Sequence, residues 1–375
     1  MSQAETQFKQ DYRSSKKALD VGACMQHARN KFGKSLFSQI REIYSLSRAD
    51  GKLNSQEYYY FNLYDDRKFP FGEKVRFLSD RIHGAVIRKC CDVHWWATAD
   101  DKFIAYTLLE ACGAPIPRTR AVFCRTPRSF GRLRKLADAE QLAAFLANPD
   151  HYPLFAKPIE GIGSFGAYLL RGYAGGELQL HDGSTMPIAD FIAKLDADQG
   201  YLLQEALEPH PSLRQFGEYA STVRVIVIID QGRPEILHTV WKIPANNNFA
   251  DNFWRDKNLL AAIDPKTGTV ERAIRGVGPA LEEIETHPDT GARLKGFVLP
   301  DWRRLVDLCL ESAGIFSQIR YQSWDIAMCP EGPVVIEVNT GSAFNLSQLA
   351  EGKGFLDERF GAFLKNNGYN LKLRH

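Results

Sequence analysis

The hydrophobic period of the chain changes near residue 150, and this change limits the folds that it can adopt. Residues 1–98 have the spacing of a mainly helical region. Beyond residue 150, short apolar runs with a period of two predict strands at 152–157, 167–170, 201–205, 222–229, 235–242, 324–328 and 334–338. Among them, the apolar stripe of Trp302–Ala313 predicts one clear helix. Strands mixed irregularly with helices indicate an α+β fold with antiparallel sheets.

Composition excludes several classes of protein. The 375 residues are 44% hydrophobic and 25% charged, which is typical of a globular chain and not of a disordered or coiled-coil one. The densest apolar run, Val225–Ile229, is far shorter than the ~20 residues that cross a bilayer, and Met1–Arg13 has no apolar secretory core. Seven scattered cysteines without a C-x-x-C pair fit neither a disulfide framework nor a zinc site. We therefore expect a cytoplasmic protein with reduced thiols and no membrane span.

Positive charge is concentrated in the first part of the chain. Residues 1–150 hold 25 Lys and Arg against 17 Asp and Glu, whereas residues 151–375 hold 22 against 28. The excess peaks between Arg118 and Lys135, a stretch without an acid. Because no aromatic interleaving or nucleic-acid motif accompanies it, we expect a solvated face or a lip that attracts a phosphorylated ligand, and no nucleic-acid partner.

A glycine-rich segment follows Lys157-Pro158, and its glycines at 161, 163 and 166 match G-x-G-x-x-G. In a dinucleotide-binding fold a helix follows directly, but here the next residues, 167–170, are short and apolar. The segment is therefore predicted to be the tip of a β-hairpin. Backbone N–H groups at such a tip can close over phosphates, with Lys157 as counter-charge. A glycine-rich turn with an exposed lysine is the alternative.

A second predicted hairpin carries Asp325 on one strand and Glu337 and Asn339 on the next. If it folds about Glu331, Asp325 and Glu337 are cross-strand partners, and the core face carries Ile326, Met328, Val334, Ile336 and Val338. Two carboxylates about 5 Å apart repel each other, so neutralising either one should leave stability unchanged or raised. Oxygen ligands at this spacing suit Mg²⁺. A solvated sheet face with chance acids is the alternative.

The order of these features resembles the ATP-grasp superfamily across roughly residues 99–350. Asp101-Lys102 opens a helix that ends in GAPIP; AKP and the glycine-rich hairpin, an LLQEAL strand and D-x(11)-E-x-N follow. The chain is most similar to the sugar-transfer-associated (hexapeptide transferase-related) branch, at 204–211, 221–224, 251–252, 286–291, 296–302 and 336–339. Residues 1–98 resemble that branch only loosely, chiefly at Glu57–Asp65.

The resemblance implies an ATP-grasp fold in which two α+β subdomains clasp ATP. The first, with a pre-ATP segment, would span 99–203 and the second 204–375, after the helical region 1–98. Phosphates would be bound by Lys102, Lys157, Gly161, Gly163, Ser164 and Gly166. The adenine would be contacted by Gln204, Glu205 and Leu207, and the ribose by Glu208 or His210. Mg²⁺, with Mn²⁺ as an alternative metal, would be held by Asp325, Glu337 and Asn339.

Three further residues are expected to act in catalysis. The resemblance implies that Arg224 and Lys242 meet phosphate oxygens or a developing acyl phosphate, and that Asn252 lies on the loop covering the acceptor site. Both faces of 222–229 are apolar around Arg224, so its charge must be paired. We expect the nucleotide or acyl phosphate to be this partner, a protein carboxylate being the alternative. Two positions depart from the family pattern: Ser323 replaces an arginine, and Phe253-Trp254 replaces a Gly-Gly pair.

The expected activity is an ATP- and Mg²⁺-dependent ligation that releases ADP. A small-molecule carboxylate, free or linked to a sugar or peptide, would form an acyl phosphate that an amine captures; a thiol or hydroxyl is the less favoured acceptor. The alternatives are phosphoryl transfer to a sugar or another hydroxyl, and a non-catalytic nucleotide-binding module in glycan assembly.

Overall fold

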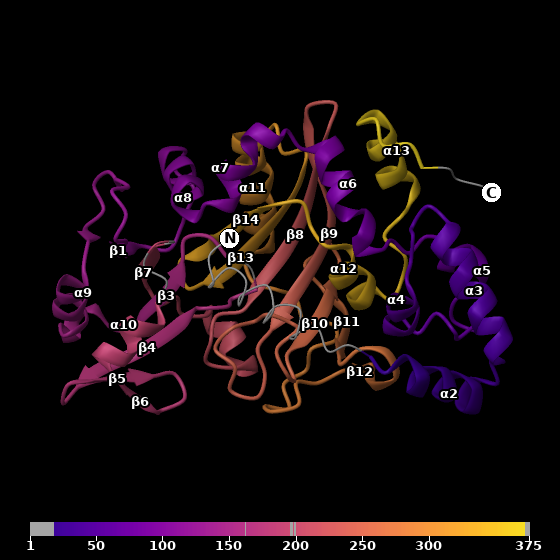
Figure 1. Ribbon diagram of the computed structural model, residues 1–375, viewed down its shortest axis with the longest axis horizontal. Coiled ribbons are helices and arrows are strands. Elements are labelled where there is room, and N and C mark those ends of the chain that lie inside the picture. Colours follow the sequence, from indigo (N-terminus) through magenta and orange to yellow (C-terminus); the bar gives the residue numbers. More distant parts are fainter. Residues whose placement is uncertain (1–18, 162, 196–197, 199, 372–375) are drawn as a thin grey trace.

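The computed structural model describes residues 19–161, 163–195, 198 and 200–371, and it is built around two seven-stranded sheets. The sheets lie side by side, and the first helices of the chain lie at the far edge of the second sheet (Figure 1). The predicted α+β architecture with a helical N-terminal region is confirmed.

The first sheet has the order β2-β1-β7-β3-β4-β5-β6, and its neighbours are antiparallel except for β1 and β2. Its strands are β1 (Thr119–Phe123), β2 (Lys135–Leu136), β3 (Leu154–Pro158), β4 (Tyr168–Ala174), β5 (Glu177–Leu180), β6 (Thr185–Pro187) and β7 (Tyr201–Glu205). Helices α9 (Ala139–Leu146) and α10 (Ile188–Lys194) bury Phe145 and Phe191 in one cluster with Leu154 of β3. Because side chains alternate along β3, Phe155 and Lys157 lie on the opposite face.

The second sheet is antiparallel throughout, in the order β12-β11-β10-β9-β8-β13-β14. Its strands are β8 (Thr222–Asp230), β9 (Arg233–Ile243), β10 (Leu259–Ile263), β11 (Val270–Arg275), β12 (Glu282–Ile284), β13 (Tyr321–Cys329) and β14 (Gly332–Thr340). Both faces are covered. Ala261 of β10 shares a core cluster with Leu305 of α11 (Trp302–Ala313), and its neighbour Leu260 shares another with Leu349 of α12 (Phe344–Glu351). The last helix is α13 (Glu358–Asn366).

The N-terminal region packs against the second sheet through aromatic side chains. Its helices are α2 (Val21–Phe32), α3 (Leu36–Arg48), α4 (Ser55–Tyr60), α5 (Phe71–Lys74) and α6 (Asp80–Cys90), and α7 (Trp96–Asp100) and α8 (Lys102–Ala111) lead into the first sheet. Tyr58, Tyr59 and Tyr64 are almost completely buried, in the same cluster as Val240 and Leu260 of the sheet. Four of the five aromatic residues at 58–64 are thus core residues.

The β13–β14 hairpin pairs Asp325 with Glu337, as predicted, but its turn differs from the prediction. Cys329 pairs with Gly332, so the turn centres between Pro330 and Glu331, and a register shift beyond Asp325 restores the expected partner. This β-bulge adds one residue to β14 and changes which side chains face inward. Val335 and Val338 are therefore in the core, whereas the predicted core residues Val334 and Ile336 are only half-buried.

The structure also bears on the predicted domain boundary, the cysteines and the predicted absence of a membrane span. The predicted division between residues 203 and 204 falls inside β7, all five residues of which pair within the first sheet. All seven cysteines are free thiols. In the part of the chain that the structure describes, no helix combines the length and the apolar character needed to cross a membrane.

Candidate functional site

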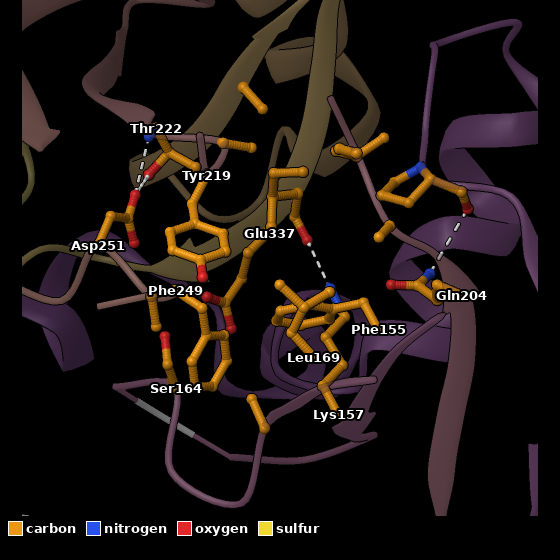
Figure 2. A pocket seen from close by; sticks show the side chains of 18 of the residues that line it. Phe155, Lys157, Ser164, Leu169, Gln204, Tyr219, Thr222, Phe249, Asp251 and Glu337 are labelled. Carbon is orange, nitrogen blue, oxygen red and sulfur yellow. Dashed lines mark hydrogen bonds between the residues drawn. The ribbon is translucent and has the colours of Figure 1, made fainter. Parts of the chain in front are cut away.

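A cavity of about 370 Å³ lies between the two sheets. The first sheet contributes Phe155, Lys157, Leu169 and Gln204 to its wall, and the second contributes Thr222, Ala327, Ile336 and Glu337. Figure 2 shows Lys157 and Glu337 projecting into the cavity from opposite sides, with Gln204 at one end and Thr222 and Asp251 at the other. A mostly apolar cleft of this size with a few convergent charges is a typical small-molecule site.

Lys157 is buried at the base of this cavity. Its Nζ donates a hydrogen bond of 2.6 Å to the Tyr106 hydroxyl and lies 3.4 Å from the Ile336 carbonyl oxygen. Burial lowers the pKa of Lys157 to about 8, although the negative charges of Glu337 and Asp325 act in the opposite direction. Lys157 therefore presents a poorly solvated cation to the cavity, which favours an anionic ligand.

Lys102 connects the glycine-rich loop to the β13–β14 hairpin. It opens helix α8, which Asp101 caps by accepting a hydrogen bond of 3.0 Å from the Ile104 backbone. The Lys102 Nζ donates to the Gly161 carbonyl oxygen at 2.9 Å and lies 3.0 Å from Glu337 Oε1. The two lysines predicted to bind phosphate thus lie in one cavity, although they are 55 residues apart in the sequence.

The glycine-rich loop joins the antiparallel strands β3 and β4, so the predicted hairpin tip is confirmed. Gly161, Gly163 and Ser164 line the cavity, and Ser164 adopts a left-handed backbone with φ of 60°. Gly166 is not part of the wall. It has φ of 68°, and a Cβ there would come within 2.9 Å of the Tyr201 hydroxyl, so close packing requires glycine at this position.

Most of the predicted adenine-binding residues lie along β7 and the bend after it. Gln204 is buried, and its Nε2 donates a hydrogen bond of 3.0 Å to the Thr119 hydroxyl. The carboxylate of Glu205 pairs with two arginines of the basic stretch, Arg118 and Arg120, at 3.1 and 3.0 Å. Leu207 and Glu208 also line the cavity.

His210 does not line the cavity. Its Nδ1 accepts a hydrogen bond of 3.2 Å from the Ser212 backbone and caps the short helix at Pro211–Phe216. Of the two predicted ribose ligands, only Glu208 is therefore placed at the cavity wall, where it pairs with Arg214 at 2.8 Å.

Asp325 is held by two cations. Arg224 makes a two-pronged contact with it, from Nε to Oδ1 at 2.9 Å and from Nη2 to Oδ2 at 2.7 Å, and the Lys242 Nζ lies 3.1 Å from Oδ2. Burial alone would raise the pKa of Asp325, but the charges of Arg224 and Lys242 outweigh it and hold the pKa well below the usual range. The carboxylate is therefore ionised at neutral pH.

These contacts change two expectations about the hairpin. The partner of Arg224 in the structure is a protein carboxylate, the alternative that sequence reasoning did not favour. Asp325 and Glu337 do not rely on a metal to relieve their repulsion, because Arg224 and Lys242 compensate one and Lys102 the other. Neutralising Asp325 is therefore expected to lower stability, since Arg224 would lose its carboxylate partner and Lys242 would keep Asp251 at 3.5 Å.

The donor set of the hairpin fits a hard divalent cation. Asp325 and Glu337 supply ionisable oxygens on paired positions, and Asn339 follows two residues along β14. Among the residues described, no three His, Cys, Asp or Glu side chains converge on one metal-sized site, so an amide would have to complete this set. Oxygen-only ligands of this kind suit Mg²⁺ together with phosphate oxygens.

The segment 249–258, here called the latch segment, joins the two sheets at the glycine-rich loop. Asn252 Nδ2 donates a hydrogen bond of 2.7 Å to the Gly163 carbonyl oxygen, and Arg255 Nη2 donates one of 3.3 Å to that of Ser164. Asn252, which is predicted to lie on the loop covering the acceptor site, thus contacts the glycine-rich loop. Phe253 anchors the segment in the aromatic core of the N-terminal region, with Tyr58.

Sequence reasoning missed several residues at this site. Asp251 accepts hydrogen bonds from the backbone and hydroxyl of Thr222 and lies 3.5 Å from the Lys242 Nζ. Tyr106 bridges Lys157 and the Ile336 carbonyl oxygen at the bulge. The Asp251-Asn252 pair was a usable signal, but nothing in the local pattern pointed to Tyr106 or Arg255.

Comparison with known proteins gives several solved structures with low similarity and one protein family. Among solved structures, purK, an N5-carboxyaminoimidazole ribonucleotide synthetase, is 15% identical with a TM-score of 0.38, over 68% of this chain and 51% of that one. D-alanyl-alanine synthetase A from Vibrio cholerae O1 biovar eltor is 12% identical with a TM-score of 0.44, over 75% and 68%. VanG D-Ala:D-Ser ligase from Enterococcus faecalis is 16% identical with a TM-score of 0.40, over 73% and 64%.

The chain spans about half the length of the purK protein. No curated protein matches it. The model of one protein family, described as sugar-transfer associated ATP-grasp, matches residues 85–362, which is well over half of the chain. The match covers both sheets and all the cavity residues described above, and it begins inside α6. The chain therefore belongs to the sugar-transfer associated ATP-grasp family.

Proposed function

We propose that this protein is an ATP- and Mg²⁺-dependent carboxylate–amine ligase that releases ADP and phosphate. The observation that carries the proposal is the charge arrangement of the cavity. Lys102, Lys157 and the glycine-rich loop line a space of about 370 Å³ together with the carboxylate of Glu337, which lies 3.0 Å from the Lys102 Nζ. Cations and backbone amides suit the phosphates of a nucleotide, and apolar residues suit its base.

The chemistry requires no protein nucleophile. An oxygen of the substrate carboxylate attacks the γ-phosphorus of ATP, the bond to the β-phosphate oxygen breaks, and ADP leaves. The nitrogen of an amine then attacks the acyl carbon, inorganic phosphate leaves, and the nitrogen loses a proton. Lys102 and Lys157 would hold phosphate oxygens, and Arg224 and Lys242 would face the developing acyl phosphate. Positioning and charge neutralisation supply the rate in such reactions.

Asp325, Glu337 and Asn339 would hold Mg²⁺, or Mn²⁺, which when bound supplies neutralisation of phosphate charge. The subdomains of the proposed enzyme divide after β7, at 99–205 and 206–375, because β7 belongs wholly to the first sheet. The substrates would be a small-molecule carboxylate and an amine.

Product analysis tests the proposal. We expect purified protein incubated with ATP, Mg²⁺ and a mixed metabolite extract to release ADP and free phosphate in equal amounts, alongside a new amide. ADP with a phosphorylated product would replace the ligase by a phosphotransferase. Release of AMP, or no nucleotide turnover with any extract fraction, would contradict both.

The latch segment gives a second prediction. Asn252→Ala removes the hydrogen bond to Gly163, so the glycine-rich loop should close less often over nucleotide, and we expect the KM for ATP to rise about three- to tenfold. Asn248→Ala is the matched control, because among the described residues the Asn248 amide donates only to Asp256 and Asn258 of the latch segment. An equal effect of both substitutions would indicate a general disturbance of the segment and no specific role for Asn252.

A further inference from the structure

Helix α3 carries an exposed apolar face that the proposed ligase activity does not use. Leu36, Phe37, Ile40 and Tyr44 are 39%, 77%, 57% and 63% exposed, and they are four of the seven large hydrophobic side chains at the surface of the described chain. Their spacing places them on one side of the helix. We call these four residues the α3 face. Helix α3 lies at the outer edge of the molecule, on the side away from the first sheet (Figure 1).

The opposite side of α3 is packed against the N-terminal region, so the exposed apolar residues do not result from a poorly packed helix. Gln39 and Leu46 are buried, and the Gln39 amide donates to the Lys34 carbonyl oxygen at 2.8 Å and accepts from the Tyr59 hydroxyl at 2.7 Å. The helix is therefore fixed against the N-terminal core by its polar and apolar inner side. A helix held in this way that leaves Phe37 largely exposed presents apolar side chains that the described part of the chain does not cover.

Helices α2 and α3 carry mostly positive charge, with the acids Asp20 and Asp50 just beyond their outer ends. Residues 21–48 contain five Lys or Arg and a single acid, Glu42. Glu42 is tied to two buried lysines, Lys34 at 2.5 Å and Lys74 at 3.0 Å, so it adds no free negative charge to the surface. Four cations of these two helices remain exposed: Arg29, Lys31, Arg41 and Arg48. Within the described residues, none of the four takes part in an ion pair.

Two of these cations border the apolar residues directly. Arg41 follows Ile40, and the Arg48 guanidinium lies 5.8 Å from the centre of the Tyr44 ring. An apolar helix face with aromatic residues and a basic rim is the pattern of helices that lie in the interface of a bilayer, where the rings enter the headgroup region and the cations meet anionic lipid.

We propose that the α3 face docks the protein on an anionic phospholipid surface. A protein partner would be an equally good match for the apolar residues alone, but the uncompensated positive charge at the rim favours a broad negative surface. The inference is independent of the proposed function, since α3 contributes no residue to the cavity.

Vesicle co-sedimentation of the full chain tests this inference. We expect binding to vesicles that contain phosphatidylglycerol and much weaker binding to phosphatidylcholine alone, with salt reducing the former. Phe37→Ser combined with Ile40→Ser should lower the partition coefficient at least about tenfold, because both side chains lose their burial in lipid. Arg41→Gln combined with Arg48→Gln should lower it about tenfold on anionic vesicles only.

Val298→Ser is the matched control, because Val298 is an exposed apolar residue (54%) outside the N-terminal region and should have no effect. All variants alter exposed side chains, so unchanged circular dichroism and melting temperature should accompany the losses. Absence of binding by the unaltered protein, or binding that survives the Phe37 and Ile40 substitutions, would overturn the proposal. So would a dimer in sedimentation velocity that these substitutions dissociate, without vesicle binding, since a second copy would then cover the face.

Discussion

Asp325→Asn is expected to lower the free energy of unfolding by about 3–5 kcal/mol and to abolish turnover. The stability loss follows because Arg224 and Lys242, both largely buried, would lose the carboxylate that compensates them. The loss of turnover, at least about 10²–10³-fold, follows if the same carboxylate binds the metal. Chemical denaturation and a nucleotide-turnover assay measure the two effects separately.

A double-mutant cycle makes this prediction specific. Arg224→Met alone should also destabilise the protein, because it leaves Asp325 with Lys242 as its only cation. Arg224→Met combined with Asp325→Asn should lose less than the sum of the two, because no unpaired carboxylate or guanidinium remains and Lys242 keeps Asp251 at 3.5 Å. Glu331→Gln, an exposed acid at the turn of the same hairpin, is the control. Additive losses would mean that the Arg224–Asp325 pair contributes nothing net.

Lys157→Met should weaken ATP binding by about 1.5–3 kcal/mol, that is by roughly ten- to a hundredfold, without destabilising the fold. Methionine fills nearly the same volume, and the ammonium that it replaces is poorly solvated, with a hydroxyl and a carbonyl oxygen as partners. Lys135→Met is the control, because Lys135 lies in the same sheet and its Nζ donates to the Thr126 carbonyl oxygen outside the cavity. Calorimetry showing unchanged affinity in Lys157→Met would remove Lys157 from the nucleotide site.

The pKa of Lys157 also predicts how affinity depends on pH. Its pKa of about 8 lies below its ordinary value of 10.5, so above pH 8 the free protein loses the proton that an anionic phosphate needs. ATP affinity should therefore fall as pH rises through 8, by up to about tenfold per unit, with proton uptake on binding. Calorimetry at pH 8.5 in buffers of different ionisation enthalpy measures that uptake, and Lys157→Met should abolish it.

The lowered pKa of Lys157 also makes the stability of the fold depend on pH. Between pH 8 and 10.5 the unfolded chain binds more protons at this lysine than the folded chain does. Lys157 therefore contributes a stability increase as pH rises through that window, opposite to its effect on nucleotide affinity.

The local pattern of the chain determined those parts of the site that depend on alternation and turns. Two strands on either side of a Pro-Glu turn placed Asp325 near Glu337, although their direct pairing also depends on the bulge in β14. Glycines between two short apolar runs placed the glycine-rich loop at a hairpin tip. The position of Lys102 at the start of a helix that Asp101 caps also follows from neighbouring residues alone. In each case the information lies within about fifteen residues, which is the range over which periodicity and capping act.

Seven strands were not predicted, and burial, short length or charged residues explain why several of them show no alternating pattern. β10 (Leu259–Ile263) is buried on both faces, so it shows no alternation of apolar and polar residues. β2 and β6 are only two and three residues long, and β1 lies in the arginine-rich stretch, where its charged residues obscure the period. The bulge in β14 was missed for a related reason, because an extra residue in one strand leaves no mark in the sequence of either.

Tertiary structure alone decided which charges meet. Arg224 and Asp325 are 101 residues apart and become neighbours only because β8 and β13 pair in the second sheet. The sequence required a partner for a buried guanidinium, since an unpaired charge is too costly, but periodicity cannot name a partner on a distant strand. The contacts of Asn252 with the glycine-rich loop, and of Tyr106 with Lys157, likewise join segments that are 89 and 51 residues apart in the sequence. Residue types and local spacing therefore determined the kind of chemistry that this chain can support, whereas the pairing of distant strands decided how its charges are arranged, because electrostatic energy depends on distance in space and not along the chain.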